Sequence, residues 1–240
     1  MTEGSGMNKI EGINVNTFDS NQALSSSLSD RIAEILACAI EQKGEATLVV
    51  SGGRTPKPLF SELNEQSIDW SKVTILLADE RWVLPDSDDS NDKLIKTCLL
   101  KNKAAAAKYV SLFTGHEHAE NAAKALETRI ASLPTFDVVV LGMGNDGHTA
   151  SLFPCCEQLE AGLTQPQALI ATQPITAPYT RLSLTKQRLL NSHNVFFHIT
   201  GDDKWSVLQT ALEQPDPKKY PISDFVHAGT TPINVYYSAA

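Results

Sequence analysis

One Gly-rich segment places an acid and an imidazole directly after an apolar run. Residues 142–152 read Gly-Met-Gly-Asn-Asp-Gly-His-Thr-Ala-Ser-Leu, and the run before them, Phe136-Asp-Val-Val-Val-Leu141, is typical of a buried parallel strand. The glycines allow a tight turn and the close approach of a ligand. Imidazole is the side chain best suited to moving protons near neutral pH. We therefore predict a catalytic loop here, in which His148 could transfer protons and Asp146 could orient its ring or raise its basicity.

A second Gly-rich turn has the residue types of a phosphate-binding loop. Ser51-Gly52-Gly53-Arg54-Thr55 lies between the apolar run at 47–50 and a helical pattern that follows Pro56. The glycines free backbone amides, Ser51 and Thr55 add hydroxyl groups, and the start of a helix favours an anion. An ordinary strand-to-helix turn is the more common meaning of such a segment by itself. It matches neither the Walker A loop nor the dinucleotide fingerprint.

Three cations lie next to predicted strands or at a helix start, where they could reach a ligand. Arg81 follows the apolar run at 73–78, Arg181 precedes another, and Lys204 lies in the first turn of a helical pattern. Residues at the carboxyl ends of parallel strands often line the ligand crevice. A solvated surface charge is the alternative for each, and Asp202 and Asp203 could simply pair with Lys204. A cation in a first turn opposes the helix dipole, which slightly favours a bound anion at Lys204.

Helical and strand patterns alternate along the chain, as they must to bring these residues together. Apolar residues recur at helical spacing over about 20–43, with Gly44 as the stop signal, and short apolar strands are expected at 47–50, 73–78, 109–113, 136–141, 195–200 and 232–237. This alternation predicts an α/β fold with a mostly parallel sheet covered on both faces. Residues 154–184 suggest a small antiparallel excursion. We expect a single domain over 1–240, with residues 1–10 disordered.

Composition limits the classes of function. The chain has 240 residues with a net charge of −8, which argues against a general binder of nucleic acid or anionic membrane. No apolar run reaches membrane-spanning length, and no signal peptide is visible. The spacing of the His and Cys residues fits no common metal site, so we expect no metal and no organic cofactor. The four cysteines are expected to be reduced thiols in a cytoplasmic protein.

Taken together, the motifs resemble those of the 6-phosphogluconolactonases, in the glucosamine-6-phosphate isomerase/6-phosphogluconolactonase family. The resemblance runs from about residue 20 to 238 and is most specific in Asp-Gly-His-Thr-Ala-Ser-Leu-Phe-Pro154. The motifs that carry it, in order, are Ser51–Pro56, Asp79–Trp82, Asp89–Asn91, Gly142–Pro154, Arg181–Thr185 and Gly201–Lys204. It implies a three-layer α/β/α sandwich with a Rossmann-like sheet. Arg54 stands where many members of the family carry Ser.

The resemblance also implies an activity, the hydrolysis of 6-phospho-D-glucono-1,5-lactone to 6-phosphogluconate in the oxidative pentose phosphate pathway. By that resemblance His148 is the base and then the acid, and the residues expected to hold phosphate or sugar are Ser51, Gly52, Gly53, Thr55, Arg81, Arg181 and Lys204. A lactone is an activated ester, so an oriented water, a base and oxyanion donors are enough. We expect amides near Gly144 to Gly147 to be those donors.

Two alternatives remain from the sequence. One is a sugar-phosphate isomerase or deaminase on the same fold, although deaminases carry Asn-Met-Asp-Glu-Tyr where this chain has Ala78-Asp-Glu-Arg-Trp82. The other is a non-catalytic sugar-phosphate sensor, which would normally lose the imidazole and add a DNA-binding motif. The retained His148 and the acidic charge favour the enzyme. We expect a monomer or a small homo-oligomer whose partner is a small sugar phosphate lactone.

Overall fold

The main sheet of this protein is mostly parallel, and the two Gly-rich turns follow the carboxyl ends of two of its central strands. A computed structural model describes residues 7–10 and 13–239. Within them the sheet has eight strands, in the spatial order β1 (Met7–Ile10), β2 (Ile13–Phe18), β11 (Ile233–Ser238), β10 (Val195–Thr200), β7 (Val138–Leu141), β3 (Ala46–Val50), β4 (Val73–Leu77) and β6 (Lys108–Val110). Only β1 runs antiparallel to its neighbour; each of the other pairings is parallel.

The two central strands owe their place to their composition. Every residue of β3 and of β7 is buried, as expected for parallel strands that are covered on both faces. From β3 the chain proceeds outward through β4 to β6, and then returns to the other side of β3 for β7, β10 and β11. The order therefore reverses between β3 and β7. In open α/β sheets, ligands bind beyond the carboxyl ends of the strands at such a reversal.

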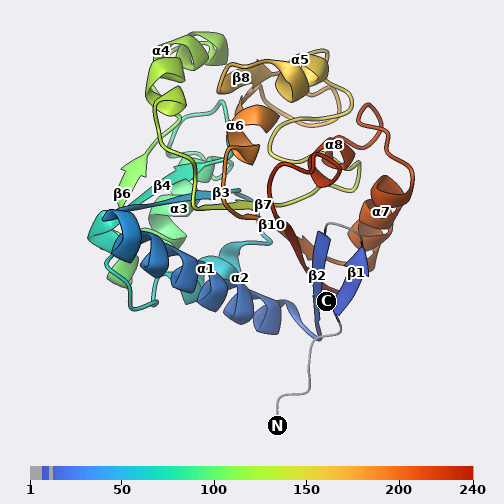
Figure 1. Cartoon of the computed structure of the whole chain (residues 1–240). Coiled ribbons are helices and arrows are strands. Elements are labelled where there is room, and N and C mark those ends of the chain that lie inside the picture. The colour runs from blue at the N-terminus through green and yellow to red at the C-terminus, as the bar shows by residue number, and fades with distance from the viewer. Residues whose placement is uncertain (1–6, 11–12, 240) are drawn as a thin grey trace.

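Helices cover both faces of the main sheet, so the fold is the predicted three-layer α/β/α sandwich. Figure 1 shows α1 and α2 on one side, and α4, α5, α6 and α8 on the other. The α-helices are α1 (Asn21–Lys43), α2 (Lys57–Leu63), α3 (Asn91–Cys98), α4 (Ala119–Ala131), α5 (Leu159–Thr164), α6 (Lys186–Leu190), α7 (Asp202–Glu213) and α8 (Ile222–Val226), with short 3₁₀ turns at Trp70–Lys72 and Asn102–Ala106.

Local signals explain where the first helix begins and ends. Ser20 caps α1 by accepting a hydrogen bond from the Ala23 amide, and Gly44 ends it in the left-handed conformation with φ of 82°. The apolar stripe of α1, which includes Leu24, Leu28 and Ile32, is fully buried against the sheet.

Since one cluster of buried hydrophobic residues joins the main sheet, its helices and the second sheet, we infer a single domain.

A small antiparallel sheet confirms the predicted excursion and extends it. Its order is β5 (Asp79–Arg81), β9 (Arg181–Leu184) and β8 (Leu169–Thr172). The sequence predicts the excursion over 154–184 alone, but the chain leaves β4 through Ala78 and pairs at once with β9. This pairing makes Arg81 the direct neighbour of Arg181.

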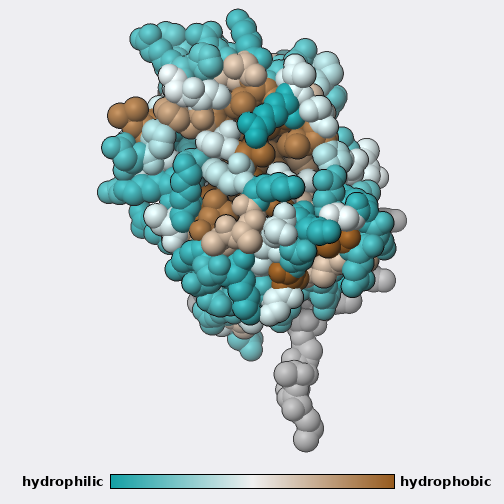
Figure 2. All heavy atoms as spheres, turned by 90° about the vertical axis from the view of Figure 1, so that its left-hand side faces the viewer, coloured by the Kyte–Doolittle hydropathy of each residue, from teal (hydrophilic) through white to brown (hydrophobic). Residues whose placement is uncertain are grey.

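Two boundaries differ from the sequence prediction. Of residues 1–10, expected to be disordered, 7–10 form β1 by pairing with β2, while residues 1–6 lie outside the described part of the chain. The strand expected at 109–113 is Lys108–Val110. In the described residues, no helix is long and apolar enough to cross a membrane. The face turned to the viewer in Figure 2 is mostly hydrophilic, with apolar side chains gathered across its middle.

Candidate active site

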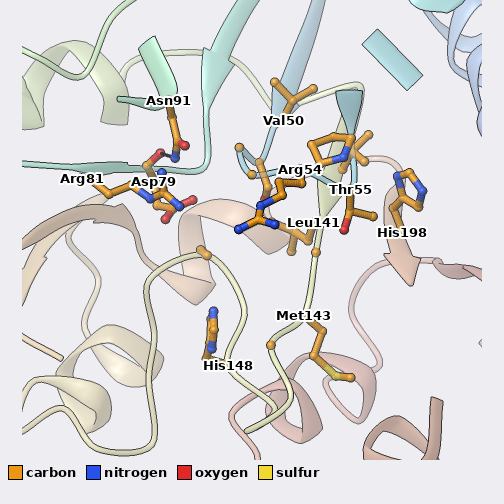
Figure 3. Close-up of a pocket in the computed structure, with 18 of the residues that line it drawn as sticks. Val50, Arg54, Thr55, Asp79, Arg81, Asn91, Leu141, Met143, His148 and His198 are labelled. Atoms are coloured by element: carbon orange, nitrogen blue, oxygen red, sulfur yellow. Dashed lines mark hydrogen bonds between the residues drawn. The ribbon is translucent and has the colours of Figure 1, made fainter. Parts of the chain in front are cut away.

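A cavity of about 260 Å³ lies where the order of the strands reverses. Its walls come from the ends of β3 and β7, from the turns that follow them, and from residues of β5, β9, β10 and α7. The cavity lies at the position that the parallel topology favours for a ligand. Figure 3 shows the side chains that face it, including Arg54, Asp79 and His148.

All but one of the site residues predicted from the sequence line this cavity. Those that line it are Ser51, Gly52, Gly53, Thr55, Arg81, His148, Arg181 and Lys204. The exception is Asp146, which contacts His148 and lines an adjacent groove. Segments more than 150 residues apart in the sequence therefore meet around one small space.

His148 and Asp146 form a close pair within the loop that follows β7. Nδ1 of His148 lies 2.6 Å from Oδ1 of Asp146, and the backbone N–H of His148 donates to the same oxygen at 3.2 Å. The ring stacks on Phe153 at 3.9 Å between centroids. Burial favours the neutral form of Asp146, but the hydrogen bond and charge of His148 outweigh it, so the pKa of Asp146 lies below its ordinary value. The ring of His148 therefore lies in contact with both the Asp146 carboxylate and Phe153.

Glycine is required at position 144 because the His148 ring packs against the backbone there. A Cβ at Gly144 would lie 2.2 Å from two ring atoms of His148. The Gly144 amide donates to the carbonyl of His148, and the Gly147 amide donates to the carbonyl of Gly144. The sequence suggests amides near Gly144 to Gly147 as oxyanion donors, but those of Gly144 and Gly147 themselves are used to close the loop. Their hydrogen bonds shape the loop and hold His148 in place.

The Ser51–Thr55 turn is shaped by a residue from another part of the chain. A Cβ at Gly52 would lie 2.0 Å from Oδ1 of Asn91, so only glycine lets the Asn91 side chain pack here. The Asn91 amide group in turn donates to the carbonyl of Asp79 at 3.0 Å. Gly53 has φ of 98°, which favours glycine. The helix predicted to follow Pro56 begins at Lys57 and has seven residues, and the turn before it lines the cavity.

Two of the three predicted cations are held by backbone carbonyls. Nη1 of Arg81 donates to the carbonyl of Asp89 at 2.7 Å, and Arg181 donates to the carbonyl of Pro178 at 3.1 and 3.3 Å. The guanidinium of Arg181 also lies 5.6 Å from the centre of the Phe153 ring. Burial, together with the charge of Arg81, lowers the pKa of Arg181. Because their partners are neutral carbonyls, the positive charge of both arginines remains available to a bound anion.

Lys204 faces the cavity from the first turn of α7. Burial lowers its pKa, and among the described residues it has no ion pair. In the described part of the chain neither Asp202 nor Asp203 forms an ion pair with Lys204, and Oδ1 of Asp202 accepts a hydrogen bond from the Tyr237 hydroxyl. A half-buried ammonium without a protein carboxylate is expected where an anion binds.

Three further residues of the cavity wall are not predicted as site residues. Asp79 is buried, and its Oδ2 accepts from the Ser151 hydroxyl at 2.6 Å. Asn91 supports the turn, and its place in the Asp89-Ser-Asn91 motif was the available signal. His198 lies in β10, where its Nε2 is hydrogen-bonded to Oδ1 of Asn21 at 3.0 Å, and it also lines the cavity.

The charge of the cavity suits a small anion. Its charged lining residues in the described chain are four cations, Arg54, Arg81, Arg181 and Lys204, and one acid, Asp79. No group of three or more His, Cys, Asp or Glu residues in the described ranges could hold a metal ion. The fold and the site together define an α/β protein with a cationic pocket at a strand-order reversal and a carboxylate-paired imidazole at its wall.

Comparison with known proteins gives the family. The family model described as glucosamine-6-phosphate isomerases/6-phosphogluconolactonase matches residues 19–233, and the chain belongs to this family. A 6-phosphogluconolactonase from Rhizobium meliloti is 41% identical over 94% of this chain and 98% of its own. The crystal structure of a 6-phosphogluconolactonase from Shewanella baltica is 44% identical, covers 98% of this chain and 100% of its own, and has a TM-score of 0.90. A monomeric glucosamine-6-phosphate deaminase, 17% identical with a TM-score of 0.79, shares the fold.

Proposed function

We propose that this protein hydrolyses 6-phospho-D-glucono-1,5-lactone to 6-phospho-D-gluconate, a step of the oxidative pentose phosphate pathway. The names of the similar proteins support this activity. The observation that carries it is the position of His148, whose ring lines a cationic cavity and is bonded to Asp146 on its other side. The substrate is anionic at its phosphate and reactive at C1, so it needs one cationic region and one proton-transfer group in the same space.

The chemistry begins with the neutral form of His148. Because Nδ1 faces a carboxylate oxygen at 2.6 Å, the ring proton resides on Nδ1 and the lone pair on Nε2. Nε2 takes a proton from water as the water oxygen attacks C1, and a tetrahedral oxyanion forms. When the bond from C1 to the ring oxygen breaks, the imidazolium returns the proton to that oxygen. The product is the open-chain acid, and His148 is neutral again.

The remote phosphate fixes C1 relative to the water. Arg81, Arg181 and Lys204, with the Ser51–Thr55 turn, form a divided phosphate site around the cavity. The Ser51 hydroxyl oxygen is buried and has no hydrogen-bond partner among the described residues, so a ligand oxygen would satisfy it. Binding energy gained at the phosphate offsets the entropy that the substrate loses when C1 is held in position for attack.

One observation supports a second candidate, a sugar-phosphate isomerase or deaminase. Such reactions move a proton between C1 and C2 and need a second acid or base near the sugar, and Asp79 lines the cavity. Against it, Asp79 accepts a short hydrogen bond from Ser151 and lies near the cationic Arg181, which favours a fixed carboxylate. Hydrolysis needs only His148 and water, so it requires fewer groups.

Substrate choice tests the proposal directly. Freshly prepared 6-phosphogluconolactone is mixed with the protein and acid release is followed against the spontaneous background. We expect catalysis well above background, and much poorer turnover of gluconolactone that lacks the phosphate. Release of ammonia from glucosamine 6-phosphate, with no acceleration of lactone hydrolysis, would replace this function by the deaminase.

Compartment, oligomeric state and cofactor requirement complete the proposed function. We place it in the cytoplasm, as a monomer or small homo-oligomer that works without a metal or organic cofactor. The net charge of −8 speaks against a nucleic-acid partner. All four cysteines are free thiols, as a reducing compartment requires.

A further inference from the structure

One cation of the cavity is exposed, whereas the other three are buried or partly buried. Arg81 and Arg181 donate to backbone carbonyls, and Lys204 is half-buried at the start of α7. Arg54 is exposed, and among the described residues its side chain has no hydrogen bond or ion pair. The structure therefore holds two of the cations by hydrogen bonds to backbone carbonyls, partly buries a third, and leaves Arg54 exposed.

The direction of Arg54 is set by the turn that carries it. Gly52 packs against Asn91 and Gly53 adopts a left-handed conformation, so the backbone before Arg54 is held in one shape. Figure 3 shows the guanidinium of Arg54 reaching into the cavity, while His148 enters from the opposite side. The exposed side chain keeps its charge in water and has no protein partner among the described residues, so its guanidinium is available to a ligand. Its position over the cavity favours a role with a ligand.

We infer that Arg54 is a substrate-contacting residue that binds the phosphate group, an inference that rests on the proposed function. A 6-phosphogluconolactone carries its charge at the phosphate, whereas the lactone end is neutral before water attacks. A guanidinium gains most from a bidentate contact with phosphate oxygens. Arg54 therefore supplies a fourth cationic contact to the phosphate, added to the more buried Arg81, Arg181 and Lys204.

This assignment predicts a characteristic kinetic change. Arg54 must lose side-chain freedom on binding, so its net effect is smaller than that of an already fixed cation. We expect Arg54→Gln to lower kcat/KM for the phosphorylated lactone about 10-fold, mostly through a higher KM. Arg54→Lys keeps the charge but loses the planar fork, and is expected to recover only part of the loss. Turnover of gluconolactone is expected to stay unchanged.

Lys57 provides a matched control. It lies three residues further along, is exposed, and does not line the cavity. Lys57→Gln removes the same charge from the same turn region, so it reports any effect of the long-range field alone. We expect Lys57→Gln to match the unmodified protein on both lactones. A loss equal to that of Arg54→Gln would overturn the contact, as would equal losses of Arg54→Gln on both substrates or no loss on either.

Binding of inorganic phosphate separates this inference from the proposed function, because it requires no hydrolysis. Calorimetry on the full chain is expected to give about 10-fold weaker phosphate binding for Arg54→Gln than for Lys57→Gln. Equal affinities would overturn the role of Arg54 even if the lactone is hydrolysed. If the lactone is not hydrolysed but Arg54→Gln weakens phosphate binding, the proposed reaction fails while the phosphate contact stands.

Discussion

Replacing Asp146 tests how the imidazole works, because this carboxylate lies beside His148 and does not line the cavity. We consider Asp146→Asn, which keeps the size of the side chain and removes its charge. In the structure the carboxylate accepts from both Nδ1 and the backbone N–H of His148. The amide can present its NH₂ group to Nδ1, which would favour the tautomer with the proton on Nε2. Nε2 would then no longer be free to take a proton from water.

The expected size follows from the geometry. A hydrogen bond to a charged group is worth about 1.5–3 kcal/mol, but the side chains of His148 and Asp146 are 27% and 37% exposed, and solvent weakens the contact. We therefore expect Asp146→Asn to lower kcat about 10–30-fold. His148→Ala removes the base itself and is expected to cost about 10²–10⁴-fold. Both variants should remain folded.

A double variant that combines Asp146→Asn with His148→Ala tests whether Asp146 acts through His148. Acid release from the lactone is measured for each single variant and for the double variant, with His118→Ala, an exposed histidine outside the cavity, as the control. If Asp146 acts only through His148, then Asp146→Asn has no further effect once the imidazole is gone. The reasoning is refuted if Asp146→Asn costs the same factor with and without His148, or if folded His148→Ala keeps near-normal turnover.

Four other predictions follow from the same structure. Arg181→Gln or Lys204→Gln should each lower kcat/KM for the phosphorylated lactone about 10–100-fold and spare gluconolactone; equal losses on both would contradict the divided phosphate site. Gly52→Ala should destabilise the protein by about 1–3 kcal/mol in urea unfolding, because its Cβ would overlap Asn91; an unchanged midpoint would count against this packing. Burial, with the charge of Lys204, lowers the pKa of His198 from 6.5 to about 4. As the pH falls, this histidine is therefore protonated in the unfolded state at a higher pH than in the folded state. Stability should therefore fall by about 2–3 kcal/mol as pH drops from about 6.5 to 4, and His198→Leu should lose that part of the pH dependence. Dialysis against EDTA should leave activity unchanged, whereas a loss restored by one divalent ion would overturn the metal-free mechanism.

The sequence by itself determined the features that depend on neighbouring residues. The apolar runs at 47–50 and 136–141 predict buried parallel strands, and the strands β3 and β7 formed there are buried throughout. Ser20 and Gly44 mark the ends of the first helix through local hydrogen bonds and backbone conformation. The contact between His148 and Asp146 could be predicted because the two residues lie two positions apart in one tight turn.

Only the tertiary structure decided which distant residues meet at the site. Arg81 and Arg181 become neighbours because β5 pairs with β9, across a separation that no local pattern encodes. Asn91 belongs to the Asp89–Asn91 motif, but its contact with Gly52 appears only once the two segments pack together. Strand β1 likewise requires β2, which is itself held by β11 from the other end of the chain. The direction of Arg54 also required the fold, because a side chain points into a cavity only once its walls have been assembled from segments far apart in the sequence.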